Sequence, residues 1–304
     1  MDLVEKLMAG NEKACARCLS LVENQREGYL DLLRAIRPHG KGAYRVGFTG
    51  PAGRSKSKLL ADLLEEYLKE DKKIGLFLMG PSSPRTGGAF LGNRGYFSQF
   101  AQDNRVFVRS VASRGHQGGI SYALAGMVEI LDAYGCDLIL VNGLGGPLDT
   151  DLASLVDCLV DVVPPCLGQD MDMLNAGSME QAQLFFVNQG DGDQGEKTRL
   201  DIEMMLDLQE DREDRPLVLN FKDKGIGALK EALDKYQDHL VDRGKRPRQK
   251  LKQEVLEVQG YMDRYLKEDL ARVICQEQGA IEKALEEGED PLSLGEGLLK
   301  KYFK

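Results

Sequence analysis

The chain of 304 residues is 42% hydrophobic and carries a net charge of −9 at pH 7. Its length and apolar content allow one large or two modest domains with a real core. The acidic balance, with a pI of about 5.1, excludes a general nucleic-acid binder, because no excess of cations exists to replace phosphate counterions. One basic run, RGKRPRQKLK at 243–252, is interpreted as a solvated linker or a helix start.

Three features bear on where the protein works. No apolar run approaches about 20 residues, so the sequence predicts no membrane span. The N-terminal segment MDLVEKLMAG is charged and helical in pattern, unlike a signal peptide. Six cysteines are scattered through the chain without an export signal, which predicts reduced thiols in the cytoplasm.

Residues 1–37 are predicted to form two amphipathic helices, with a break near Asn11 and an end before RPHGKG. Cys15 and Cys18 form a C-x-x-C pair inside this helical pattern, and no second pair follows at metal-binding spacing. We therefore interpret both thiols as packing groups of a helix rather than as metal ligands or a redox centre. The three histidines show no mutual spacing typical of a metal site.

The middle of the chain alternates short apolar runs with helix-length segments. The runs that predict strands are AYRVGFTG, KKIGLFLMG, CDLILVNG, ASLVDCLVDVVPP, AQLFFVNQGD and RPLVLNF. Strands separated by helices indicate a mainly parallel sheet covered on both faces. The prediction is a three-layer α/β domain over residues 39–240, with residues 1–38 as an N-terminal helical extension.

The composition changes from about residue 241 onward, where long charged helical stretches begin. Apolar residues nevertheless recur there at helical spacing: Leu251, Val255, Leu256, Val258, Met262, Leu266 and Leu270. A partly continuous apolar stripe on a helix outside the core needs a partner. Residues 241–304 are therefore predicted to form a helical arm through which two copies of the chain associate.

The stretch FTGPAGRSKSKLL at 48–60 resembles a phosphate-binding loop that departs from the pattern at one position. Gly50, Lys56 and Ser57 meet the pattern of Gly, four residues and Gly-Lys-Ser/Thr, but Ser55 replaces the second glycine. The lysine would reach the terminal phosphates and the Ser57 hydroxyl would ligate magnesium. Gly50 and Gly53 can adopt positive φ, so the loop can still form. A left-handed or close-approach conformation at Ser55 would cost roughly 1–3 kcal/mol or reshape the loop.

Several strings, in order over nearly the whole chain, resemble one known family. MGPSSPRTGGAFLGNR at 79–94 is similar to a string of the methylmalonyl-CoA mutase-associated GTPases, the MeaB/ArgK group of SIMIBI-type P-loop proteins. RVGFTGPAG, CDLILVNGLGG and FFVNQGD resemble their phosphate loop, switch strand and base-recognition motif. LMAGNEKACARCLSLVEN and RGKRPRQK resemble their N-terminal helices and the start of their C-terminal arm.

The resemblance implies a GTP-binding domain with a helical N-terminal extension and a C-terminal dimerisation arm. Members of the family act as chaperones that guard and load a cobalamin-dependent mutase, coupled to GTP hydrolysis. Several positions of this chain depart from that pattern, and the departures decide how much of the chemistry is expected.

On the magnesium side, the acidic residues of the family motifs correspond to Gly80 and Asn142. The two carboxylates that would organise a hard, oxygen-seeking cation are therefore absent together, and magnesium binding is doubtful. Asp149 and Asp151 follow a few residues later and could substitute, although their spacing does not match the motif. Gly145, which would donate its N–H to a terminal phosphate, is retained.

On the base side, the resemblance implies that Asn188 tethers the loop and that Asp191 binds the guanine ring. Gln189 replaces the lysine whose stem would cover the base. Phe221 and Lys222 stand where the family carries small residues, so an aromatic ring could crowd the base.

Three hypotheses for the function remain open. The first is a chaperone or scaffold that binds GTP or GDP weakly, with little or no hydrolysis, as a homodimer with a cobalamin-dependent enzyme as client. The second is an active GTPase whose magnesium site is rebuilt from other residues. The third is a binder of another phosphorylated ligand, such as a coenzyme A or cobalamin tail. The catalytic residues remain unassigned.

Overall fold

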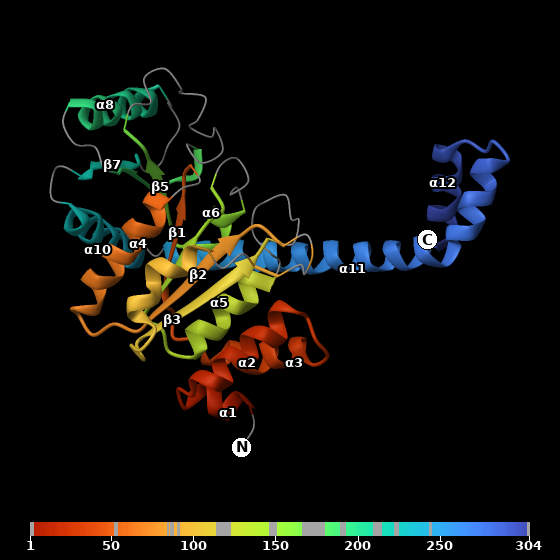
Figure 1. Cartoon of the computed structure of the whole chain (residues 1–304), viewed down its shortest axis with the longest axis horizontal. Coiled ribbons are helices and arrows are strands. Elements are labelled where there is room, and N and C mark those ends of the chain that lie inside the picture. The colour runs from red at the N-terminus through yellow and green to blue at the C-terminus, as the bar shows by residue number, and fades with distance from the viewer. Residues whose placement is uncertain are drawn as a thin grey trace. The chain divides into compact units, whose positions relative to one another are not determined.

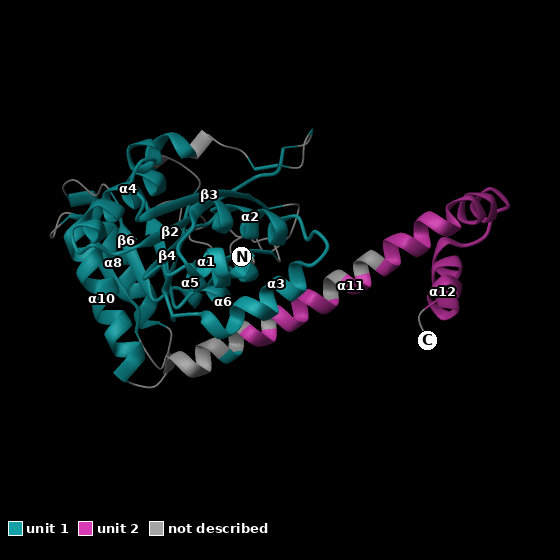
Figure 2. Cartoon of the chain, turned by 90° about the horizontal axis from the view of Figure 1, so that it is seen from below, with its two compact units in different colours: residues 1–253 teal, residues 254–304 magenta. Residues whose placement is uncertain are grey.

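The computed structural model describes most of the chain. The described residues are 3–51, 54–83, 85, 88–89, 92–113, 123–145, 151–165, 180–188, 193–208, 215–221, 225–242 and 245–302. They divide into two compact units, residues 1–253 and 254–304, which are coloured separately in Figure 2.

A seven-stranded sheet forms the centre of the first unit (Figure 1). Its order is β3-β2-β4-β1-β5-β6-β7, and every neighbouring pair is parallel. The strands are β1 (Tyr44–Thr49), β2 (Ile74–Gly80), β3 (Val106–Ala112), β4 (Leu138–Asn142), β5 (Cys158–Val163), β6 (Leu184–Val187) and β7 (Leu217–Asn220). β1 lies in the middle of this order, between β4 and β5, and its apolar residues are covered on both faces of the sheet.

Helices cover the two faces of this sheet and divide the core into two clusters. One face packs against α4 (Arg54–Leu68), α10 (Ile226–Asp242) and the 3-10 segment η2 (Gly92–Phe100). The other face packs against α5 (Ala123–Ala133), α6 (Leu152–Leu155) and α8 (Asp193–Asp207). The predicted three-layer α/β architecture is therefore confirmed.

The N-terminal segment forms three helices, so the prediction of two was wrong. They are α1 (Leu3–Met8), α2 (Glu12–Glu23) and α3 (Tyr29–Ile36), followed by the 3-10 turn η1 (Arg37–His39). The predicted break at Asn11 is present, where its side chain accepts a hydrogen bond from Ala14 N and starts α2. The second break falls at Gln25 and Gly28, which both adopt positive φ. A left-handed residue cannot continue a right-handed helix.

β3 was not predicted, because polar residues interrupt its apolar pattern. It is an edge strand whose first five residues are only half-buried. Its Arg109 donates hydrogen bonds to Glu23 and to Ser20 Oγ on α2. The polar centre of the strand therefore holds the N-terminal helices against the sheet.

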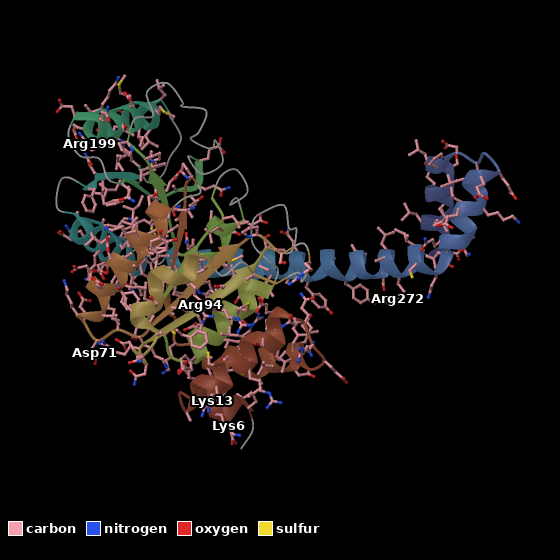
Figure 3. All side chains as sticks on the ribbon, viewed as in Figure 1. Lys6, Lys13, Asp71, Arg94, Arg199 and Arg272 are labelled. Atoms are coloured by element: carbon pink, nitrogen blue, oxygen red, sulfur yellow. The ribbon has the colours of Figure 1, made fainter. Side chains whose placement is uncertain are left out.

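Asp71, labelled in Figure 3, forms an ion pair of 3.1 Å with Arg105 just before β3.

Residues 254–304 contain most of α11 (Lys245–Glu286) and all of α12 (Pro291–Tyr302). The basic run at 243–252 thus contributes the first turns of a helix, one of its two predicted interpretations. Asp290 accepts a hydrogen bond from Ser293 N and caps the start of α12. Lys301 and Tyr302 near the end of α12 both donate to Glu277 of α11, which pairs the two helices within this unit. Over the described residues, no helix is long and apolar enough to cross a membrane.

Candidate functional site

The loop between β1 and α4 begins at a glycine that no other residue could replace without strain. Gly50 has a φ of +114°, and a Cβ atom at this position would lie 2.2 Å from the Val162 carbonyl oxygen of β5. The loop therefore turns directly against the neighbouring strand. This close approach places the N-terminus of α4 at the carboxyl edge of the sheet, where anions bind in folds of this kind.

Lys56 supplies a buried cation to this loop. Lys56 is only 3% exposed. The ammonium donates to the Gly50 carbonyl oxygen at 2.8 Å and reaches the Gly143 carbonyl oxygen, after β4, at 3.5 Å. These carbonyls partly replace the water that a buried ammonium loses. Ser57 is buried beside it at the start of α4. The loop thus presents positive charge and a hydroxyl, as the phosphate-binding prediction requires.

Ser55 fits the loop without the left-handed backbone that the sequence analysis considered. It lies in the first turn of α4, and the non-glycine residues of positive φ in the described chain are Gln25 and Asp71. No φ strain therefore arises at Ser55. Its carbonyl oxygen also accepts a hydrogen bond of 3.3 Å from Asn188 Nδ2, which follows β6. The expected tether between the base-side asparagine and the phosphate loop is present.

The strand ends on the α4 face define the two sides of the site. Side chains alternate between faces, and Leu78 and Leu140 pack in the cluster beneath α4. Gly80 and Asn142, each two residues further on, therefore face the same side as Ser57. These are the positions where the family resemblance places its acidic residues. The structure brings them to one place, and the described residues provide no carboxylate there.

Asn142 is the most informative side chain at this edge. It is 3% exposed, and its Oδ1 atom is buried without a hydrogen-bond partner among the described residues. As metal ligands, this oxygen and the Ser57 hydroxyl would both be uncharged. Mg²⁺ is a hard cation that proteins hold mainly through carboxylates, phosphates and water. The described residues of this face therefore do not fit a tightly held magnesium ion.

The other described carboxylates near the loop do not fill that role. Asp151 is exposed, and its carbonyl oxygen accepts from Ser154 at the start of α6. Asp149 lies outside the described residues. Asp161, which was not predicted from the sequence, is 2% exposed and lies level with Thr49. It belongs to the opposite face of the sheet from Asn142, because Leu159 and Val163 pack there. Its signal was a lone acid within the apolar run CLVDVV.

Two glycines follow β4 in the segment that resembles the family's switch. Gly143 N donates to the Phe48 carbonyl oxygen at 2.8 Å and extends the pairing of β4 with β1. Gly145 adopts a φ of +91°, which favours glycine. The structure therefore places Gly145 at the same edge as Lys56, in accordance with a role in phosphate binding.

The base side is described in part. Phe221 lies at the end of β7, and its ring is edge-on to the buried ring of Phe186, with centroids 6.3 Å apart. The aromatic ring is thus anchored to the core beneath α10, which gives it a packing role. Gly53, Gln189, Asp191 and Lys222 lie outside the described residues.

The thiols of the N-terminal helices take no part in this site. Cys15 and Cys18 are fully buried in α2, as their helical pattern predicts. Burial raises the pKa of the Cys15 thiol well above its ordinary value, and burial raises that of Cys136 to about 12. Such thiols stay protonated at neutral pH, and a protonated thiol is a poor nucleophile and a poor metal ligand.

The parallel sheet, the glycine turn after β1 and the buried lysine at the start of α4 define a P-loop nucleotide-binding protein. The sequence matches the family described as methylmalonyl Co-A mutase-associated GTPase MeaB over residues 15–275. The chain belongs to this family, as its motifs predicted. Family membership implies a protein that binds guanine nucleotides.

Two relatives and one solved structure illustrate the similarity. A putative GTPase of Pyrococcus abyssi is 36% identical over 263 residues, which cover 84% of this chain and 81% of the relative. GTPase ArgK of Escherichia coli is 32% identical over 197 residues, or 63% of this chain and 60% of ArgK. A crystal structure of an LAO/AO transport system kinase has a TM-score of 0.70 at 22% identity, covering 98% of this chain and 95% of that one. This last similarity shows the shared fold.

The close approach at Gly50 generates a prediction about stability. Gly50→Ala forces the loop away from Val162, whereas Gly10→Ala meets no atom within 4 Å although Gly10 also has positive φ. Both substitutions incur the conformational cost of a left-handed alanine, about 1 kcal/mol. We expect Gly50→Ala to lose at least about 2 kcal/mol more in free energy of unfolding. Denaturant titrations followed by circular dichroism measure this difference, and equal losses would refute the close approach.

Proposed function

We propose that this protein is a guanine-nucleotide-binding chaperone or scaffold that binds GTP or GDP weakly and hydrolyses GTP slowly or not at all. One observation carries the proposal. The phosphate half of the site keeps its buried lysine and glycine turn, whereas the magnesium half presents Gly80 and an Asn142 oxygen that has no hydrogen-bond partner among the described residues.

The electrostatic consequence concerns hydrolysis more than binding. Phosphoryl transfer depends on positioning and on cations that neutralise the developing charge. Among the described residues of the site, Lys56 is the cation that faces the phosphate position, and it contributes one positive charge. Loss of both metal-organising carboxylates is expected to raise the barrier by several kcal/mol. Binding of phosphates to the loop depends less on these acids, because backbone N–H groups and Lys56 contribute directly.

The alternatives are less well supported. An active GTPase would need a carboxylate on the α4 face, and Asp161, the buried acid near the loop, belongs to the other face. A different phosphorylated ligand would not need the base-side tether that Asn188 forms with Ser55. This tether favours a nucleotide over a coenzyme A or cobalamin tail.

The proposed client is a cobalamin-dependent mutase or a related enzyme. Support comes from the family description, which names association with methylmalonyl-CoA mutase. A relative of Caenorhabditis briggsae, 25% identical over 214 residues, bears the name methylmalonic aciduria type A homolog, mitochondrial. A scaffold role requires that the nucleotide-bound protein be stable, and slow hydrolysis prolongs that state.

We also propose a homodimer formed through the arm. The described side chains of the stripe predicted from the sequence are solvent-exposed: Leu251, Val255, Val258, Met262, Leu266 and Leu270 are 41–60% exposed. The side chain of Leu256 lies outside the described residues. Ile274, which was not part of the prediction, continues the stripe at 50% exposure. A continuous exposed apolar surface of this length is unusual in a monomer and is typical of an interaction site. The repeated spacing of three and four residues suits helix-to-helix packing between two copies.

The first test concerns the buried lysine. Lys56→Ala removes the fixed cation of the loop and should lower the affinity for GDP at least about a hundredfold, because charge-assisted hydrogen bonds to phosphate are strong. Lys58→Ala is the matched control, since Lys58 is exposed on the same helix and pairs with Asp62 at 3.3 Å. Its effect should stay within about twofold. Unchanged GDP binding by Lys56→Ala in titration calorimetry would disprove the phosphate-loop assignment.

The second test concerns magnesium. Because the described residues at the carboxyl edge of the sheet offer no carboxylate beside Ser57, the affinity for a non-hydrolysable GTP analogue should change less than about threefold between Mg²⁺ and EDTA. Asn142→Asp is nearly isosteric and supplies one missing charge, so its affinity should become at least about tenfold dependent on Mg²⁺. A large loss of affinity in EDTA for the unmodified protein would show a magnesium site built from other residues.

The third test concerns the dimer. Light scattering should give the mass of a dimer for the full chain without nucleotide, and of a monomer for a chain that ends at Asp242. A full-length variant with Met262→Glu and Leu266→Glu should also be monomeric, because charges would replace apolar contacts at the interface. A monomeric full chain, or a shortened chain that remains dimeric, would refute a dimer formed by the arm.

A further inference from the structure

A cavity of about 560 Å³ lies at the end of the sheet opposite the phosphate loop. Its walls come from the segments that lead into β6 and β7 and from the second half of α10. Both strands begin here and end at the nucleotide side, because the sheet is parallel. A volume of 300–1,000 Å³ is typical of pockets that bind small molecules.

The cavity combines an apolar interior with a flat aromatic wall. Its buried apolar lining consists of Ala182, Leu184, Pro216 and Ala232. On α10, the rings of Tyr236 and His239 lie within 27° of parallel, with centroids 6.2 Å apart. Such a wall suits a planar apolar group, which gains stabilisation from stacking as well as from burial.

Two cations lie in the lining, on different segments of the chain. Arg215 approaches from the segment before β7 and Lys235 from α10, whereas Glu180 is the acid of the lining. Their present partners lie outside the cavity: Arg215 pairs with Asp207 and Lys235 with Glu231, each at 2.7 Å. All four side chains are more than half exposed, so these surface ion pairs contribute little. A ligand anion can therefore compete for either cation.

We propose that this cavity binds a small organic anion with a planar apolar body, such as an aromatic carboxylate or sulfonate. The apolar body lies against Tyr236 and the buried lining, and the anionic group accepts hydrogen bonds from Arg215 and Lys235. The site is independent of the phosphate loop, so nucleotide and anion bind at the same time. The inference does not depend on the function proposed above.

Naphthalene-2-sulfonate is a suitable probe, titrated into the full-length protein and followed by ligand-observed NMR. We expect saturable binding, and weaker binding of the uncharged analogue 2-naphthalenemethanol. Arg215→Gln and Lys235→Gln should each lower the affinity for the sulfonate about three- to tenfold. Lys69→Gln is the matched control, because Lys69 is exposed and pairs with Glu66 at the same distance of 2.7 Å. It should leave the affinity unchanged.

Lys56→Ala and added GDP separate this site from the phosphate loop. Neither should alter the binding of naphthalene-2-sulfonate. Absence of saturable binding would overturn the proposal. Equal affinity of the wild type, Arg215→Gln and Lys235→Gln would overturn it as well, since the sulfonate would then bind elsewhere. Binding that is lost in Lys56→Ala would assign the probe to the phosphate loop.

Discussion

The burial of the Lys56 ammonium is the interaction on which the nucleotide side of this protein depends. A charge removed from water needs compensation, and here the carbonyl oxygens that follow β1 and β4 supply part of it. That arrangement requires the two strands to end at the same level, which their parallel register provides. It also requires the tight turn at Gly50, which brings the first carbonyl of the loop within reach of a lysine six residues later. A phosphate anion is a better partner for this ammonium than a neutral carbonyl, so the loop is prepared for an anion by the fold itself.

The order of the strands separates two parts of the nucleotide site, the positions that correspond to the family's magnesium-binding acids and the base-side tether. The ends of β2 and β4 lie to one side of β1, and the ends of β6 and β7 lie to the other. On the first side the two residues described at the motif positions, Gly80 and Asn142, are neutral, and the buried Asn142 oxygen has no described partner. On the second side Asn188 reaches the loop from β6. In the proposed function, the groups that tether the nucleotide site and the groups that would organise magnesium for hydrolysis thus lie on different strands, so that a sequence could lose one set while keeping the other.

The sequence was sufficient to predict the parallel three-layer fold, the loop after β1 and the positions at its edge. These features depend on local signals: apolar runs of strand length, glycines at turns, and a lysine and serine at fixed spacing. β3 escaped prediction because Arg109 serves a contact with Glu23 that lies 86 residues away. The third N-terminal helix depends on Gln25 adopting positive φ, which its residue type does not indicate. The burial of Asp161 was equally hidden, since one acid in a strand is compatible with either an edge or a core.

The cavity beneath α10 shows the same limit in a different form. Its lining comes from three segments, around Gln183, Pro216 and Tyr236, which meet only because β6, β7 and α10 are neighbours in the fold. No motif links these segments along the chain. Both strands run from this cavity to the nucleotide side, so a parallel sheet gives each of them two functional ends. In the proposals made above, the nucleotide and the small organic anion would bind at opposite ends of these strands. The opposite placement of the two sites keeps their ligands from competing for the same cations.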